Sequence, residues 1–214
     1  MSPEASASDR ARATMVRTQI EARGIRNPAV LAAMRQVPRE RFVPADRADR
    51  AFEDGPLPLD AGQTISQPYI VALMTELTEP GPEDIVFEAG TGSGYQTAVL
   101  ASIVRRVYTV ETVEALARTA RARLLALGLA DRVRMRIGDA KLGWPEAAPF
   151  DAIVVTAAPE EPPPALLAQL RPGGRMVVPL GPRDGAQDLC RIRRTADGRL
   201  ERESVLPVRF VPLV

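Results

Sequence analysis

The sequence predicts an α/β protein built on a mostly parallel, seven-stranded sheet, with an antiparallel edge and a helical N-terminal cap. Short β-forming runs alternate with helical segments between residues 85 and 180, which is the pattern of a parallel sheet. The last two runs are separated only by a turn, so we expect an antiparallel hairpin at the sheet edge. We expect a tail at 1–9 and one domain at 10–214, with the cap at 10–80 and the sheet at 81–214.

Length and composition exclude several classes of protein. The chain has 214 residues, 45% of them hydrophobic, which suffices for one domain with a substantial core. Its 28 basic and 27 acidic residues are interspersed, so we expect no nucleic-acid partner. We find no signal peptide and no apolar run near the roughly 20 residues of a membrane span, and expect a cytoplasmic protein without a membrane partner.

The missing histidines restrict the chemistry further. The chain contains no histidine, and Cys190 is its only cysteine. Catalysis through an imidazole and an internal disulfide are therefore excluded, and we predict no metal site.

The N-terminal segment carries clear helix signals. Residues 1–9 are rich in serine and alanine and predict a disordered tail. We expect a helix up to Arg23, ended by Gly24, and a second one capped by Asn27 that stops before Pro38. A partly helical segment and a connector rich in proline, glycine and aspartate should follow.

Ser66 precedes a proline and the apolar helix Ile70–Leu77. This position suits an N-cap, and taken alone capping explains Ser66 better than catalysis does.

The remaining elements follow a regular alternation. We expect strands at 85–88, 106–110, 133–137, 150–156, 175–179, 187–194 and 203–211, and helices at 95–102, 113–127 and 164–170. Ligands bind beyond the carboxyl ends of the strands in such sheets.

One strand is followed by a glycine loop and a helix that begins at Tyr95. Gly90, Gly92 and Gly94 permit positive φ and let a ligand approach the backbone. The unit is typical of nucleotide binding in an open α/β sheet. Its G-x-G-x-G spacing differs from the dinucleotide fingerprint, which disfavours a nicotinamide dehydrogenase.

Acidic residues at the strand ends specify the nucleotide. Glu88 precedes the glycines and suits a cationic ligand. Glu111 follows Gly90 by about 20 residues, where a carboxylate can accept both hydroxyls of a ribose. Asp139 can accept from the amino group of a base, and we expect all three acids to stay ionised beside a cation. A cationic nucleoside with a free ribose indicates S-adenosylmethionine, with S-adenosylhomocysteine as product. The expected cofactor contacts are Glu88, Gly90, Thr91, Gly92, Ser93, Gly94, Glu111, Asp139 and Ala140.

Six segments carry a resemblance to a known family. They read VPRERFV at 37–43, GQTISQP at 62–68, EAGTGSGYQ at 88–96, APFDAI at 148–153, TAA at 156–158 and VRFVPL at 208–213. With these segments the chain resembles the protein-L-isoaspartate (D-aspartate) O-methyltransferase family along nearly its whole length. It departs from the family at Ala140, where a glycine is common.

The resemblance implies a Rossmann-like methyltransferase fold and a repair enzyme, which we expect to be a monomer. Such an enzyme transfers the methyl of S-adenosylmethionine to the free α-carboxylate of L-isoaspartyl residues in damaged proteins and peptides. The ester then collapses to a succinimide, which hydrolyses partly to aspartate. The family's catalytic serine falls on Ser66, and the implied substrate contacts are Thr64, Ile65, Ser66, Gln67, Val208, Phe210 and Val211.

This chemistry suits a protein without histidine. A carboxylate has a pKa near 4 and is already a nucleophile at neutral pH. We therefore expect catalysis by positioning, with a rate that is nearly flat between about pH 6 and 8. Two alternatives stay open at this point: a methyltransferase for another substrate, and a protein that binds S-adenosylmethionine without transferring its methyl.

Overall fold

A seven-stranded sheet forms the centre of the molecule. The computed structural model of the protein describes residues 6–183 and 185–213. The sheet strands are β3 (Ile85–Ala89), β4 (Arg106–Glu111), β5 (Val133–Ile137), β6 (Phe150–Val155), β7 (Leu170–Leu180), β8 (Gln187–Arg194) and β9 (Leu200–Val208). Their order is β5-β4-β3-β6-β7-β8-β9, parallel from β5 to β7 and antiparallel from β7 to β9. The predicted fold class and its antiparallel edge are confirmed.

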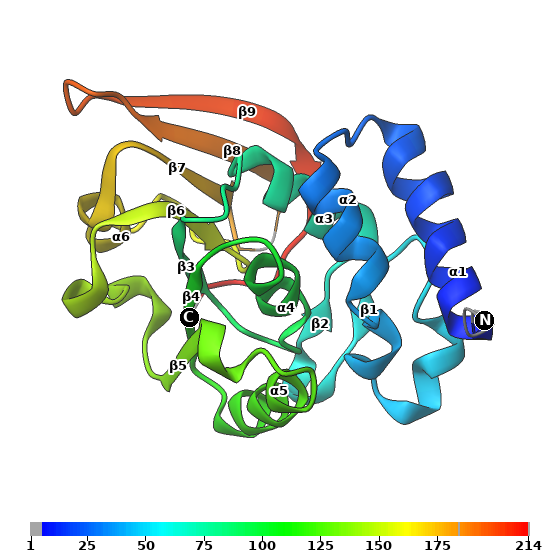
Figure 1. Cartoon of the computed structure of the whole chain (residues 1–214). Helices are drawn as coiled ribbons and strands as arrows, with labels where there is room; N and C mark the ends of the chain where they lie inside the picture. Colours follow the sequence, from blue (N-terminus) through cyan, green and yellow to red (C-terminus); the bar gives the residue numbers. More distant parts are fainter. Residues whose placement is uncertain (1–5, 184, 214) are drawn as a thin grey trace.

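Helices cover both faces of this sheet. They are α1 (Ala7–Met15), α2 (Pro28–Gln36), α3 (Pro68–Leu77), α4 (Tyr95–Ala101), α5 (Glu114–Ala126) and α6 (Pro164–Gln169). Figure 1 shows α1 and α2 at one end of the molecule and α6 at the other. Side chains alternate along β3, so Val86 joins the hydrophobic core shared with the N-terminal helices and Phe87 joins the core beneath α6. The N-terminal cap is thus continuous with one face of the sheet.

The N-terminus differs from the predicted tail. Ser6 Oγ accepts a hydrogen bond from the Asp9 backbone N–H, and the Asp9 carboxylate accepts one from the Ser6 N–H. This capping box starts α1 at Ala7, and Arg12 pairs with both Asp9 and Glu40. The prediction of disorder is therefore wrong for residues 6–9, because composition alone did not reveal the cap. Residues 1–5 lie outside the described residues.

The next boundaries agree with the sequence. A π-helical turn (Val16–Ile20) and a 3₁₀ turn (Glu21–Arg23) continue α1 and end at Gly24, whose φ is 98°. Asn27 Oδ1 accepts from the backbone N–H groups of Ala29 and Val30 and caps α2.

Other elements differ in extent. Strand β1 (Leu57–Pro58) lies within the predicted connector at 54–62 and pairs antiparallel with β2 (Thr64–Ile65), just after it; both strands are too short to leave a periodic pattern. Strand β7 begins five residues earlier than predicted, and β9 ends at Val208 rather than Val211.

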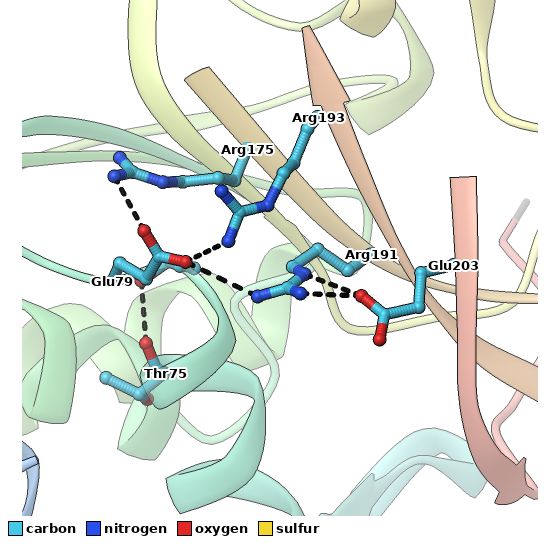
Figure 2. A network of polar contacts seen from close by, with 7 residues as sticks. Thr75, Glu79, Arg175, Arg191, Arg193 and Glu203 are labelled. Carbon is cyan, nitrogen blue, oxygen red and sulfur yellow. Dashed lines mark hydrogen bonds and ion pairs between the residues drawn. The ribbon is translucent and has the colours of Figure 1, made fainter. Parts of the chain in front are cut away.

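A cluster of arginines fixes the end of α3 to the antiparallel strands (Figure 2). Glu79, just past this helix, has a φ of 48°. Its carboxylate pairs with Arg175 at 2.9 Å, with Arg191 at 3.3 Å and with Arg193. Arg191 also bonds Glu203 on β9. Partial burial would raise the pKa of Glu79, but the hydrogen bond and charge of Arg175, with the charges of Arg193 and Arg191, lower it overall.

Candidate active site

The glycine loop between β3 and α4 forms one wall of a hollow at the carboxyl ends of the strands. Gly90, Gly92 and Gly94 have φ values of 96°, 54° and 87°. A Cβ on Gly90 would lie 2.4 Å from Thr156 Oγ1, whereas a Cβ on Gly92 would meet no atom within 4 Å. Gly92 therefore leaves its backbone open to a ligand in the hollow. Gly94 packs against Ala120 of α5 instead, with 3.2 Å between an added Cβ and the alanine Cβ.

Glu111 lies at the end of β4 and lines the same hollow. One carboxylate oxygen accepts from the Gly92 backbone N–H at 2.7 Å, and the other accepts from the Val113 N–H at 2.9 Å. A carboxylate has about four acceptor positions, so each oxygen can still accept a ligand hydroxyl. The exposed backbone of Gly92 lies beside Glu111, whose carboxylate is fixed by two backbone N–H groups. This arrangement fits the ribose of a nucleoside.

Most of the predicted cofactor and substrate residues line the hollow. The predicted residues that line it are Thr64, Ile65, Ser66, Gly90, Thr91, Gly92, Ser93, Glu111, Ala140 and Val211. Three predicted cofactor residues, Glu88, Gly94 and Asp139, do not line it.

Glu88 lies beneath the loop rather than facing the hollow. Its side chain is fully buried, and one carboxylate oxygen accepts from the hydroxyls of Thr97 and Thr109. The other oxygen has no partner among the described residues. Burial raises the pKa of Glu88 to about 8, despite the hydrogen bonds from Thr109 and Thr97 that lower it, and nearby Glu111 raises it further. The expectation that Glu88 faces the ligand is wrong, because its side chain does not line the hollow, whereas its ionisation beside a bound cation stays a prediction.

Asp139 is exposed and starts the turn after β5. Its Oδ1 accepts from the Lys141 backbone N–H at 2.8 Å, and the next residue, Ala140, lines the hollow. The predicted contact of Asp139 with a base stays a prediction, which this geometry does not support.

The loop that carries Ser66 is held by a buried arginine. Helix α3 begins at Pro68 and its N-cap is Gln67, so the capping interpretation of Ser66 is wrong. Arg39, fully buried, donates from Nη2 to the Ser66 carbonyl oxygen and from Nε to that of Ala51, both at 2.8 Å. Its guanidinium lies 4.8 Å from the centre of the Tyr95 ring. Burial lowers the pKa of Arg39 to about 10, so the group remains charged at neutral pH.

The C-terminal segment closes the opposite side of the hollow. The backbone N–H of Ala158 donates to Val211, and the N–H of Leu213 donates back to Ala158. This pairing places Val211, Pro212 and Leu213 along the hollow, next to the end of β6.

A groove of about 500 Å³ adjoins the hollow at Ser66. Five of the predicted substrate residues line this groove: Thr64, Ser66, Gln67, Val208 and Phe210. Thr64 and Ser66 line both spaces, so a ligand in the groove can meet a ligand in the hollow at these two residues.

Several lining residues were not predicted as site residues. They are Gln63, Val71, Tyr95, Gln96, Val110, Thr112, Val113, Thr156, Ala157, Pro212 and Leu213 around the hollow, and Arg23, Pro56, Ile70, Leu206, Pro207 and Arg209 around the groove. Many are apolar residues at element ends, which resemble ordinary core residues in a sequence. A signal was available for those that lie within the resembling segments, namely Gln63, Tyr95, Gln96, Thr156, Ala157, Arg209, Pro212 and Leu213.

Comparison with known protein families identifies the family of the chain. Residues 10–214 match the family model described as protein-L-isoaspartate(D-aspartate) O-methyltransferase. The chain belongs to this family.

Members of the protein-L-isoaspartate O-methyltransferase family resemble the chain over its length. The chain is 56% identical over 207 residues to a Methylorubrum populi protein-L-isoaspartate O-methyltransferase, covering 97% of this chain and 96% of that one. It is 56% identical to protein-L-isoaspartate O-methyltransferase 2 of Pelobacter propionicus, covering 95% and 90%.

Solved structures agree with the fold. One, named protein-L-isoaspartate O-methyltransferase, has a TM-score of 0.81 and 26% identity and covers 96% of this chain, while the chain spans 65% of that longer protein. A Plasmodium falciparum structure assigned to the same family, in complex with S-adenosyl-L-homocysteine, has a TM-score of 0.81 and 24% identity, covering 95% and 98%. The predicted family is confirmed, and with it the class of S-adenosylmethionine-dependent methyltransferases.

Proposed function

We propose that this chain methylates the free α-carboxylate of L-isoaspartyl residues in damaged proteins and peptides, with Ser66 as the catalytic residue. The observation that carries the proposal is the position of Ser66 between the hollow and the groove. In the hollow, a nucleoside can contact the backbone of Gly92 and the carboxylate of Glu111. In the groove, a peptide can contact the end of β9.

The residues of the chain perform this reaction by positioning. When bound, S-adenosylmethionine supplies a methyl group on a positively charged sulfur. The Ser66 hydroxyl makes no hydrogen bond with any described residue, so it is available to orient the acceptor carboxylate. Arg39 fixes the backbone at Ser66, and the hydrogen bonds with Ala158 fix the C-terminal segment along the hollow. No base is needed because the acceptor is already ionised.

The test of substrate choice uses paired peptides that differ only in isoaspartate or aspartate. We expect methyl ester on the isoaspartyl peptide and essentially none on its partner. Ser66→Ala should lower the rate by about 10- to 1000-fold, the range of a lost orienting hydrogen bond, with the affinity for S-adenosylmethionine nearly unchanged. Ser204→Ala, on the exposed part of β9, is the matched control. Equal labelling of both peptides would remove the proposed function, and a fully active Ser66→Ala would remove the role of Ser66.

Cofactor binding has a separate test. A valine at Gly92 would extend into the hollow, so Gly92→Val should weaken S-adenosylmethionine binding at least tenfold, about 1.4 kcal/mol. Gly198→Val is the control, because Gly198 also has positive φ and open space but lies in the β8–β9 turn. Calorimetry that gives equal affinities for the two variants would exclude the hollow as the cofactor site.

We further propose a cytoplasmic monomer without a nucleic-acid partner. The formal net charge of +1 supports the absence of a nucleic-acid partner, since acidic and basic residues balance along the chain. Among the helices of residues 6–183 and 185–213, none is long and apolar enough to cross a membrane. Light scattering tests the oligomeric state.

A further inference from the structure

The groove beside Ser66 has an uneven distribution of charge. Arg23 and Arg209 line it, and the described residues that line it include no carboxylate. Asp54, outside the lining, pairs with Arg23 at 3.2 Å and accepts from Gln67 Nε2 at 2.7 Å. The charge of Arg23 is therefore partly balanced within the protein.

Arg209 is a cation of the groove that no described acidic residue balances. It is exposed on the segment after β9 and makes no hydrogen bond or ion pair with any described residue. Its neighbours on this segment are fixed, since the Phe210 backbone N–H donates to Gln187 Oε1 at 2.8 Å. The segment after β9 thus places the guanidinium of Arg209, which has no described partner, along the groove that a peptide would occupy.

Arg23 contributes a second positive group from a different part of the chain. Its guanidinium lies 3.6 Å from the centre of the Tyr69 ring, which holds the side chain against the start of α3. The N-terminal segment, the Ser66 loop and the end of β9 therefore all supply parts of one groove, and two of them supply cations.

We propose that this groove selects isoaspartyl segments that carry an acidic residue beside the isoaspartate, with Arg209 as the specificity-determining residue. The proposal rests on the proposed function and adds the class of substrate to it. A peptide carboxylate near Arg209 gains an ion pair without breaking an existing one, whereas a basic side chain meets two positive groups. Because the contact lies at an exposed rim, it should act mainly on binding and weaken with salt.

The experiment compares three isoaspartyl peptides that differ only in one flanking residue, which is Glu, Gln or Lys. One series varies the residue before the isoaspartate and another the residue after it. In at least one series we expect KM to rise from Glu to Gln to Lys by about 3- to 10-fold at each step in low salt, with kcat nearly constant. About 0.5 M salt should remove most of the difference.

A charge reversal identifies the residue responsible. Arg209→Glu should reverse the order of the three peptides and leave the affinity for S-adenosylmethionine unchanged. Arg202→Glu is the control, because Arg202 is exposed on β9, outside the groove, and has no ion pair with a described residue. It should keep the wild-type order.

The outcomes separate this inference from the proposed function. If wild-type protein methylates no isoaspartyl peptide, the proposed function fails. If it methylates all three with equal KM in both series, or if Arg209→Glu keeps the wild-type order, the charge selection is overturned and the proposed function stands.

Discussion

Glu79 and Glu88 are close in sequence and opposite in environment. Glu79 is partly exposed past the end of α3, and three arginines surround its carboxylate. Glu88 is fully buried in β3, where two threonine hydroxyls donate to one oxygen and no cation among the described residues pairs with it. The pKa of Glu79 is lowered and that of Glu88 is raised to about 8. The burial of a carboxyl group and the charges around it, rather than its residue type, thus decide whether it is ionised at neutral pH.

The largest expected effect of this contrast is on the pH dependence of stability. The pKa of Glu88 is about 8 in the folded protein, against a reference value of 4.5. Between these values the folded state binds more protons, so the free energy of unfolding should fall as pH rises, by about 1.4 kcal/mol for each unit of pKa difference. Glu79 has the opposite effect. Its pKa is lowered in the folded protein, so its contribution to the free energy of unfolding is lost as pH falls and the carboxylate becomes protonated.

Glu88→Gln isolates this effect, since glutamine has the shape of the neutral acid and cannot ionise. We expect urea denaturation of this variant to show a much smaller decline in stability between pH 5 and 8 than wild-type protein shows. An identical decline in both proteins would mean that Glu88 is not the group that titrates.

The second effect is the loss of the buried carboxyl group itself. Glu88→Ala leaves a cavity and removes the acceptor of the Thr97 and Thr109 hydroxyls. At pH 6 we expect the free energy of unfolding to fall by about 2–4 kcal/mol. Glu88→Gln should stay within about 1 kcal/mol of wild-type protein, because it keeps the volume and an acceptor. Similar stabilities of the two variants would contradict a structural role for this carboxyl group.

A smaller effect, on S-adenosylmethionine binding, distinguishes Glu88 from Glu111, which lines the hollow. Glu111→Gln replaces one of two acceptor oxygens with an amide, which cannot accept from the Gly92 or Val113 N–H. We expect about tenfold weaker binding of S-adenosylmethionine by calorimetry, and less than threefold for Glu88→Gln at pH 7. A larger loss in Glu88→Gln would return Glu88 to the ligand contacts.

The smallest effect concerns Glu79. Glu79→Gln removes the acid from among three arginines, but partial exposure limits the loss to about 0.5–1 kcal/mol in low salt. The difference should shrink in 1 M salt, where exposed charges are screened. Glu201→Gln is the control, because Glu201 is exposed on β9 without an ion pair to a described residue. Equal effects of the two substitutions would show that the arginine cluster adds no stability.

The sequence predicted the fold well because long periodic segments determine it. Strands β5 and β8 begin and end where expected, and Asn27 and Gly24 mark helix ends as predicted. The β1–β2 hairpin was missed because two-residue strands leave no period.

The site was predicted only in part, because position along the chain does not fix the direction of a side chain. Glu88 and Glu111 both lie at strand ends, and only Glu111 lines the hollow. Arg39 lies within a resembling segment, yet its contact with Ser66 joins residues 27 positions apart. Such long-range contacts to the main chain leave no local signal in a single sequence.

Because of the contact between Arg39 and Ser66, the conformation of the loop does not depend on the side chain at residue 66. Arg39 donates a hydrogen bond to the carbonyl oxygen of residue 66, a group that every amino acid provides. The side chain at this position can therefore be exchanged while the loop keeps its anchor. A library of all amino acids at residue 66 would vary the chemistry offered to an acceptor against a constant scaffold, which makes this position a natural starting point for redesign toward other nucleophiles.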